Sequence, residues 1–326
     1  MRKILQLSVS IILLVGILAG CSNDGDNTVK IGYFPNLTHV ATIVALENNY
    51  FEEEFGHGVT IDTLQFNNGG LFMEAMQTKE IDVGTVGPGP LLNIYVKNPE
   101  FHIISGAVNG GAVLAVTKDS GIDDLEDLDG TRVAIPVIGS TQDVMLRKAL
   151  QEVDLDATSS GGTVELFAAA PAETATLFTQ GSVEAAATQE PWGYTLETQA
   201  DGKLLLGWDE FAWGKESTNT VVAATSDFTE NKELTTAYLT AHKKAVEFIK
   251  ENPEEAQDIV IKHIQELTGK EIDKEETEVA FSRLEVTTNV NEQVIQEMAD
   301  ISKEAGYVDS SDITGLIDLS ILEEIE

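Results

Sequence analysis

The residues best suited to bind a small solute form one short polar stretch, Ser140-Thr141-Gln142-Asp143, directly after a predicted strand over residues 132–137. Hydroxyl groups at such a position typically cap the first turn of a helix, so the stretch predicts a helix start. The free amide groups of a helix start carry a partial positive charge, which favours a small oxyanion. The alternative is that Ser140 only caps its own helix.

Cationic side chains that could meet such an anion are scarce. Beyond residue 20 the sequence contains three arginines, Arg132, Arg147 and Arg283. Arg147 stands four residues after Asp143, a spacing that predicts an ordinary surface ion pair along one helix face. An anion at this helix start would therefore be held mainly by amide dipoles and neutral hydrogen-bond donors.

The sequence contains none of the short motifs by which common enzymes are recognised: GxxxxGKS/T, GxSxG, HExxH and a complete GxGxxG are all missing. Its five histidines do not fall at the spacing of a zinc site. We therefore predict no catalytic residue, no metal ligand and no cofactor, and a protein that is not an enzyme. Two alternatives stay open: an extracellular enzyme of unknown reaction, and a metal receptor that uses His39 and Glu190.

The only cysteine, Cys21, follows an apolar run behind a basic N-terminus. The run is shorter than the ~20 residues of a spanning helix, so residues 1–20 are predicted to be a signal peptide. Leu18-Ala19-Gly20-Cys21 resembles the bacterial lipobox, which implies that Cys21 is lipidated and becomes the new N-terminus. The alternative is a chance cysteine after an ordinary cleavage site. Residues 21–28 are small and polar, as expected for a lipidated tether on the extracytoplasmic face of the cell membrane.

The remaining chain alternates predicted strands and helices, which favours two α/β lobes built from mostly parallel sheets flanked by helices. Strands are expected over residues 29–34, 59–66, 81–86, 132–137, 164–168, 183–188 and 220–224. Helices are expected over residues 38–47, 71–78, 141–153 and 172–179. Everything after residue 230 is expected to be helical and to return to the first lobe.

Two stretches, residues 75–90 and 176–191, resemble each other weakly. Each combines a helix end, an acidic residue after a β-branched one (Asp82, Glu184), a strand of small residues and a turn that contains proline. We interpret the pair as an internal repeat that supports two similar lobes. The alternative is that any two strand-helix units share this pattern.

Ligands of open α/β sheets bind beyond the carboxyl ends of the strands, where strand-to-helix turns gather. The turns that meet this condition are residues 35–39, 67–70, 87–90, 109–111, 139–142 and 189–192. Glycine lets the backbone approach a ligand closely, and hydroxyl and amide side chains donate hydrogen bonds without net charge. Glu190-Pro191-Trp192 adds either a pocket wall with a polar anchor, or a surface glutamate beside a core tryptophan.

The formal net charge of the 326 residues is −35. So acidic a chain repels nucleic acid and anionic lipid surfaces, and neither is an expected partner. We interpret the charge as a solvated acidic surface and infer no ligand from it.

Several segments, in order along nearly the whole chain, resemble the binding proteins of nitrate/sulfonate/taurine-type ABC importers. Besides the lipobox they are IGYFPNLTHVA (31–41), MEAMQTKEIDVGTVGPGP (73–90), GGAVLAV (110–116), GTRVAIPVIGSTQDVMLRKAL (130–150), QEPWGYTLE (189–197) and EAGYVDSSDITGLIDLSIL (304–322). The ordered set is specific for the family and not for the ligand. It departs from many relatives at Thr42 and Ile43, where they have a shorter run with proline, and no arginine falls in a pocket turn.

The resemblance implies a two-lobed fold like that of type II periplasmic binding proteins, with residues 29–116 and 222–326 in the first lobe and 117–221 in the second. Two crossing strands, near residues 114–117 and 220–223, would form the hinge. The implied protein is a monomer that closes around one small ligand and docks on an ABC permease in the membrane. The implied ligand-binding residues are Asn36, His39, Gly89, Gly111, Ser140, Thr141, Gln142, Glu190 and Trp192.

The ligand expected from this resemblance is an oxyanion such as an alkanesulfonate, taurine or nitrate. Relatives of the fold also bind thiamine-type pyrimidines, which would stack on Trp192 and accept Glu190 as a hydrogen-bond partner. Eukaryotic pyrimidine synthases share the fold, but their cysteine-rich segment is missing here. The pyrimidine receptor therefore stays open as an alternative, and the enzyme is disfavoured.

Overall fold

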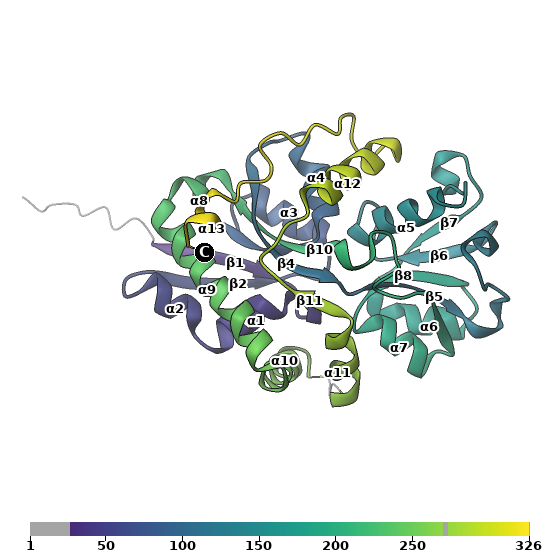
Figure 1. Ribbon diagram of the computed structural model, residues 1–326, viewed down its shortest axis with the longest axis horizontal. Helices are drawn as coiled ribbons and strands as arrows, with labels where there is room; N and C mark the ends of the chain where they lie inside the picture. The colour runs from purple at the N-terminus through teal and green to yellow at the C-terminus, as the bar shows by residue number, and fades with distance from the viewer. Residues whose placement is uncertain (1–26, 270–272, 326) are drawn as a thin grey trace, which may run out of the picture.

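Two sheets, each flanked by helices, lie side by side in the structure (Figure 1). The computed structural model describes residues 27–269 and 273–325. The predicted two-lobed α/β fold is confirmed. The predicted signal peptide, the lipidation site Cys21 and most of the tether lie outside the described residues. Within the described ranges, no helix combines the length and the apolar character needed to cross a membrane.

The first lobe is built on a six-stranded sheet with the order β11-β4-β10-β3-β1-β2. Its strands are β1 (Thr28–Tyr33), β2 (Thr60–Gln65), β3 (Val83–Val86), β4 (Phe101–Gly110), β10 (Thr218–Thr225) and β11 (Leu284–Val286). Consecutive residues of β10 alternate between two cores, with Val222 in one and Val221 in the other. This alternation is typical of a strand that is buried on both faces.

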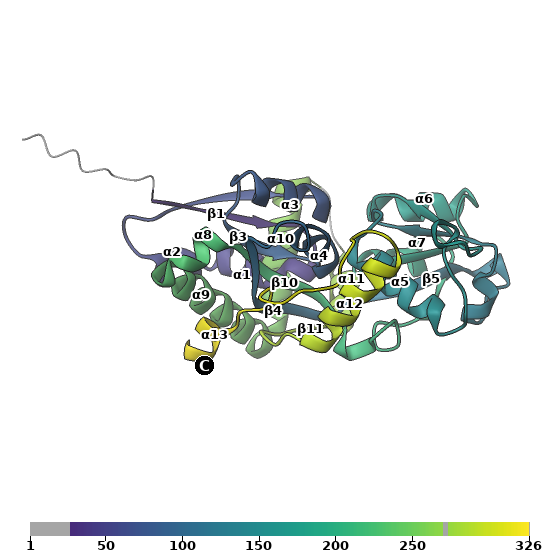
Figure 2. The ribbon, with the colours of Figure 1, turned by 90° about the horizontal axis from the view of Figure 1, so that it is seen from above.

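Helices cover both faces of the first sheet. One core contains residues of α1 (Val40–Glu47), α9 (Lys232–Glu251) and α10 (Pro253–Thr268), and the other contains residues of α3 (Gly69–Gln77), α4 (Pro88–Tyr95) and α12 (Glu292–Glu304). The lobe is completed by α2 (Tyr50–Phe55), α8 (Ser226–Glu230), α11 (Lys274–Ser282) and α13 (Ser320–Ile325). The chain after residue 230 therefore returns to the first lobe, as expected, and α11 and α12 lie at its border with the second lobe (Figure 2).

The second lobe is built on a five-stranded sheet with the order β7-β6-β8-β5-β9. Its strands are β5 (Ala112–Thr117), β6 (Arg132–Ile135), β7 (Glu165–Ala168), β8 (Ala185–Gln189) and β9 (Gly202–Leu206). One core contains residues of α5 (Thr141–Gln151), and the other contains residues of α6 (Thr174–Thr179) and α7 (Trp192–Gln199).

Both sheets are mixed, although four of the six strands of the first sheet and four of the five strands of the second run in one direction. In the first sheet β1 pairs in parallel with β2 and β3, whereas the pairs β10–β3, β10–β4 and β11–β4 are antiparallel. In the second sheet β6 pairs in parallel with β7 and β8, whereas β5 pairs antiparallel with β8 and β9. The strand that follows each crossing, β5 in the second sheet and β10 in the first, runs against its neighbours on both sides. Strand-helix alternation carries no signal of this reversal.

The chain also changes sheet at other residues than expected. The predicted lobe boundaries at 116/117 and 221/222 differ from the strand membership, because all of β5 belongs to the second sheet and all of β10 to the first. The first crossing lies at Gly110 and Gly111, whose φ angles of 67° and 72° are in the left-handed region that glycine favours. The second crossing lies between Leu206 and Thr218.

The weak internal repeat has a structural counterpart. Asp82 precedes β3 and accepts a hydrogen bond from the backbone amide of Lys30 in β1, at 2.9 Å. Glu184 precedes β8 and accepts one from the backbone amide of Arg132 in β6, also at 2.9 Å. The acidic residue of each repeat therefore joins two neighbouring parallel strands of its own lobe, at equivalent places in the two sheets.

Candidate functional site

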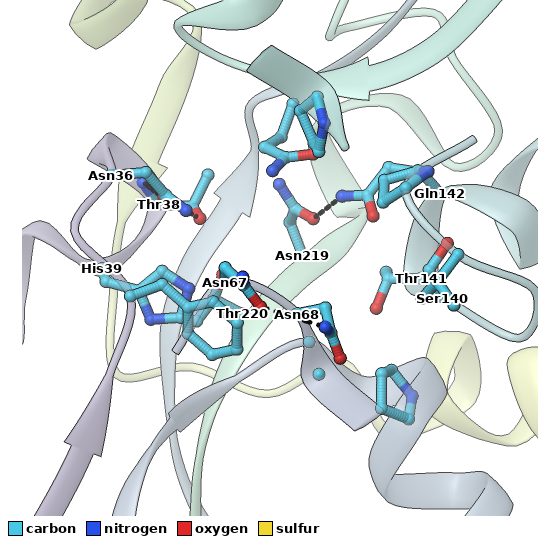
Figure 3. A pocket seen from close by; sticks show the side chains of 18 residues that line it. Asn36, Thr38, His39, Asn67, Asn68, Ser140, Thr141, Gln142, Asn219 and Thr220 are labelled. Carbon is cyan, nitrogen blue, oxygen red and sulfur yellow. Dashed lines mark hydrogen bonds between the residues drawn. The ribbon is translucent and has the colours of Figure 1, made fainter. Parts of the chain in front are cut away.

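A cavity of about 80 Å³ lies between the two lobes (Figure 3). Polar side chains from both lobes and from the crossing strand line it. The first lobe contributes Asn36, Thr38, His39, Asn67 and Asn68; the second contributes Ser140, Thr141, Gln142 and Gln189; and β10 contributes Asn219 and Thr220. Among the described residues that line the cavity, none carries a full charge, because its one titratable side chain is a buried histidine.

His39 forms the first-lobe wall of the cavity. Its ring stacks on Phe34 with the ring centroids 4.5 Å apart, and its Nδ1 is hydrogen-bonded to the hydroxyl of Thr85 at 2.8 Å. Burial lowers the pKa of His39 to about 3, because a charged imidazole would lose its hydration there. His39 is therefore neutral at physiological pH and offers no positive charge to an anion.

The start of α5 forms the second-lobe wall, as the sequence predicted. Ser140 caps the helix, since its hydroxyl oxygen accepts a hydrogen bond from the amide of Asp143 at 3.3 Å. The hydroxyl of Thr141 accepts a hydrogen bond from the amide of Gly89, at 3.1 Å, and thereby joins the second lobe to α4 of the first. In the described part of the chain, the backbone amides of Thr141 and Gln142 have no hydrogen-bond acceptor. Two amides and two hydroxyl groups are thus available at this wall.

Beneath this helix start lies a buried charged cluster formed by Asp143, Arg147 and Tyr307. Arg147 Nε donates to Asp143 Oδ1 at 3.0 Å, and both side chains are at most 5% exposed. The prediction of a surface ion pair is therefore wrong. The hydroxyl of Tyr307 donates to Asp143 Oδ2 at 2.5 Å and accepts a bond from Arg147 Nη2 at 2.7 Å. Burial, followed by the Asp143 charge, raises the pKa of Tyr307. The charge of Arg147 is thus engaged within the cluster.

Two predicted site residues, Glu190 and Trp192, are not among the described residues that line the cavity. The carboxylate of Glu190 is fully buried and accepts hydrogen bonds from Arg283 at 2.9 Å and from the amide of Tyr194 at 3.0 Å. Arg283 also pairs with Glu197 at 2.6 Å. Burial raises the pKa of Glu190, and the pairing with Arg283 opposes that shift. Glu190 therefore joins the second lobe to the end of α11, and Trp192 begins α7 nearby.

Gly89 and Gly111 also lie behind the lining, where they allow two segments to approach each other. A Cβ atom on Gly89 would lie 2.8 Å from the backbone nitrogen of Thr141 in the other lobe, so a side chain there would push the lobes apart. The amide of Gly111 donates to the carbonyl of Arg283, and its carbonyl accepts from the amide of Glu190. Of the nine predicted residues, the cavity therefore brings together Asn36, His39, Ser140, Thr141 and Gln142.

Sequence reasoning missed Asn219 and Thr220, because β10 reads as an apolar strand and no strand-to-helix turn follows them. Gln142 Nε2 donates a hydrogen bond to Asn219 Oδ1 at 3.2 Å, which connects α5 to the crossing strand. Asn67, Asn68 and Gln189 do fall in turns that the sequence assigned to the site. Within the described ranges, no group of three or more histidine, cysteine, aspartate or glutamate side chains could hold a metal ion.

The two-lobed architecture, with a polar cavity between lobes joined by crossing strands, is that of periplasmic solute-binding proteins. The chain belongs to the NMT1-like family, whose model matches residues 22–264. It is 27% identical over 190 residues to the taurine-binding periplasmic protein of Escherichia coli K12, a match that covers 57% of this chain and 56% of the relative.

Two solved structures resemble this fold over nearly its whole length. The alkanesulfonate-binding protein SsuA of Xanthomonas axonopodis pv. citri, bound to MOPS, has a TM-score of 0.74 at 18% identity, covering 90% of this chain and 98% of its own. A zinc-bound ligand-binding component of an ABC-type import system from Staphylococcus aureus has a TM-score of 0.76 at 16% identity, covering 92% and 99%. At these identities the likeness supports the fold alone.

Proposed function

We propose that this protein is an extracytoplasmic receptor of an ABC importer, which captures a small oxyanion such as an alkanesulfonate, taurine or nitrate and performs no chemistry on it. The observation that carries the proposal is the start of α5, where Ser140, Thr141 and Gln142 line one small cavity and the amides of Thr141 and Gln142 have no acceptor among the described residues. Such a helix start stabilises negative charge without a cationic side chain.

The size of the cavity supports a ligand of few heavy atoms. Its volume of about 80 Å³ is smaller than the ~150 Å³ of an engineered cavity that accommodates benzene. The two residues expected to hold a thiamine-type pyrimidine, Glu190 and Trp192, are not among the described residues that line the cavity. These observations favour the oxyanion over the pyrimidine.

Capture would proceed by closure of the two lobes about their two crossings, at residues 110–111 and 207–217. Contacts between the lobes surround the cavity: the Gly89 amide bonds to Thr141, Asn93 Nδ2 bonds to the carbonyl of Gly139, and Arg283 pairs with Glu190. Opening the cavity requires that several of these contacts break. The closed receptor would then dock as a monomer on a membrane permease.

Anchoring at the membrane would come from lipid on Cys21. Two or more acyl chains hold a protein at a bilayer stably, whereas one chain does so only marginally. A Cys21→Ala variant should leave the membrane fraction and bind ligand as the wild type does. Membrane association of this variant that survives a salt wash would contradict the lipid anchor.

A thermal-shift screen tests the oxyanion receptor. The chain from residue 22 onward, stripped of ligand by unfolding and refolding, is heated with alkanesulfonates, taurine, nitrate, bicarbonate, thiamine-type pyrimidines and zinc. A ligand at 100 times its dissociation constant adds about 2.7 kcal/mol, which shifts the transition by a few degrees. A shift by a sulfonate, taurine or nitrate supports the proposal, and a shift by a pyrimidine or zinc alone contradicts it.

A further inference from the structure

Asn219 is a cavity residue whose side-chain hydrogen bonding is incomplete. Its Oδ1 accepts a bond from Gln142 Nε2 at 3.2 Å, while its buried Nδ2 has no partner among the described residues. The side chain is 3% exposed, so water cannot reach it freely. Because Oδ1 is engaged by Gln142, the amide cannot rotate without losing that bond, and Nδ2 is a fixed donor. Buried donors of this kind are usually satisfied by a ligand or a bound water.

The side chain of Asn219 lies between the two lobes, next to both crossings. It lies in β10, at the second crossing, and Gly111 of the first crossing lies beside it, since a Cβ atom on Gly111 would be 3.5 Å from Asn219 Nδ2. The same Cβ atom would be 3.6 Å from the methyl group of Thr38 in the first-lobe wall. Figure 3 shows Asn219 between Gln142 on one side and the Asn36–Thr38 turn on the other.

Gln189 supplies a second unsatisfied group of the opposite polarity. It ends β8 and lines the same cavity, and its buried Oε1 has no donor among the described residues. The unpaired amides and hydroxyls at the start of α5 suit an oxyanion, which offers acceptors only. Gln189 Oε1 requires a donor, which neither nitrate nor the alkyl end of a simple sulfonate can provide.

We infer that Asn219 is a specificity-determining residue, and that together with Gln189 it selects an oxyanion whose other end both accepts and donates a hydrogen bond, such as a hydroxyl group. This inference rests on the proposed oxyanion receptor and narrows its ligand class. The anionic group lies at the start of α5, and the hydroxyl group accepts from Asn219 Nδ2 and donates to Gln189 Oε1. A ligand without this group leaves both buried atoms unpaired, and sites of this kind reject such analogues strongly.

Three sulfonates of nearly equal size test the inference, because they differ only at the end opposite the sulfonate. They are 2-hydroxyethanesulfonate, propane-1-sulfonate and 2-aminoethanesulfonate, which carry a hydroxyl, a methyl and an ammonium group at that end. Calorimetric titration of the refolded wild type should give the hydroxyl compound at least a ~10-fold advantage over the methyl compound. In Gln189→Leu this advantage should shrink several-fold.

The isosteric variant Asn219→Asp separates recognition from a structural role. Its Oδ1 still accepts from Gln142, but the fixed donor becomes an acceptor, so preference should pass from the hydroxyl to the ammonium compound. A general loss of folding would lower binding of all three compounds by one common factor, and melting temperatures of both variants check for it. Inversion of the preference supports the inference.

Two results would overturn it. Equal wild-type affinities for the hydroxyl and methyl compounds would leave the oxyanion receptor standing and remove the role of Asn219. A common loss in Asn219→Asp, with the order of the three compounds unchanged, would do the same. If the wild type binds none of the three compounds nor nitrate, the oxyanion receptor itself fails, and the inference fails with it.

Discussion

The hydroxyl of Tyr307, which follows α12 in the first lobe, donates a hydrogen bond to Asp143 Oδ2 in the second lobe at 2.5 Å. Asp143 belongs to the first turn of α5, and its Oδ2 also accepts from the amide of Gly139 at 2.7 Å. The contact therefore ties the C-terminal part of the chain to the helix start that lines the cavity. The Asp143 carboxylate therefore takes part both in a contact between the lobes and in the geometry of the proposed anion site.

Tyr307→Phe should weaken sulfonate binding about 3- to 10-fold, because the closed form loses a hydrogen bond between the lobes while the cavity lining stays unchanged. Tyr95→Phe is the matched control, since the Tyr95 hydroxyl donates to the carbonyl of Thr314 at 2.6 Å within the first lobe. Calorimetry should find Tyr95→Phe unchanged in affinity. Equal losses in the two variants would mean that the Tyr307 contact has no part in closure.

Replacing Ser140 and Thr141 together with alanine should weaken oxyanion binding by well over ~10-fold, because two hydroxyl groups at the start of α5 are lost. Loss of the Ser140 cap should also cost about 1 kcal/mol of folding stability. Thr179→Ala, on an exposed turn of α6, serves as control and should leave affinity unaltered. An unchanged dissociation constant in the double variant would remove the α5 start from the binding site.

Arg147→Met should lower the free energy of unfolding by about 3–5 kcal/mol, because the Asp143 carboxylate, 0% exposed, is left in the interior without its cation. Adding Asp143→Asn should restore part of this loss, since the uncompensated charge is then gone. Urea unfolding measures both variants. Lys79→Met, which removes one partner of the exposed pair with Asp227, should have little effect. An equally small effect of Arg147→Met would contradict the buried cluster.

Acid should destabilise the protein through His39. Burial lowers the pKa of His39 from 6.5 to about 3, so between these values the unfolded chain binds a proton that the folded chain excludes. The stability that this histidine contributes is present above pH 6.5 and is lost as the pH falls toward 3, by about 2 kcal/mol at pH 5. His39→Gln should flatten the decline between pH 7.5 and 5 in urea titrations.

Exposed His57 is the control for that titration, and His57→Gln should keep the wild-type decline. In His39→Gln about half of the wild-type slope should remain, because burial also lowers the pKa of His242, to about 4. If His39→Gln and His57→Gln behave alike, His39 is not the group that excludes the proton.

The start of α5 could be predicted from sequence because it depends on local chemistry. Ser140 caps the helix as its residue type and position indicated, and the strands before and after it follow the alternation of apolar residues. The weak repeat marks Asp82 and Glu184 as equivalent positions, but the hydrogen bonds they accept come from Lys30 and Arg132, each 52 positions earlier, and were not predicted.

Strand pairing and side-chain contacts between residues far apart in the sequence cannot be predicted from local patterns. Strands β4 and β9 received no prediction, because an apolar stretch does not reveal which strand it joins. The expectation of helix throughout the chain after residue 230 is wrong at β11, which pairs with the distant strand β4. The sequence suggests a ligand anchor at Glu190, but its partner Arg283 lies 93 positions later, and only the fold brings the two side chains together. Asn219 is the second residue of β10, and its hydrogen-bond partner Gln142, 3.2 Å away, lies 77 positions earlier in the chain.

Equilibrium dialysis with chemical recovery of the ligand tests the central claim most directly. Refolded chain from residue 22 onward is dialysed against 2-hydroxyethanesulfonate, ethanesulfonate, taurine and nitrate together, and the retained solute is released and identified. The account predicts one oxyanion per chain, held with micromolar or tighter affinity and recovered chemically unchanged. Retention of none of these oxyanions, or recovery of an altered compound, would contradict an oxyanion receptor that performs no chemistry.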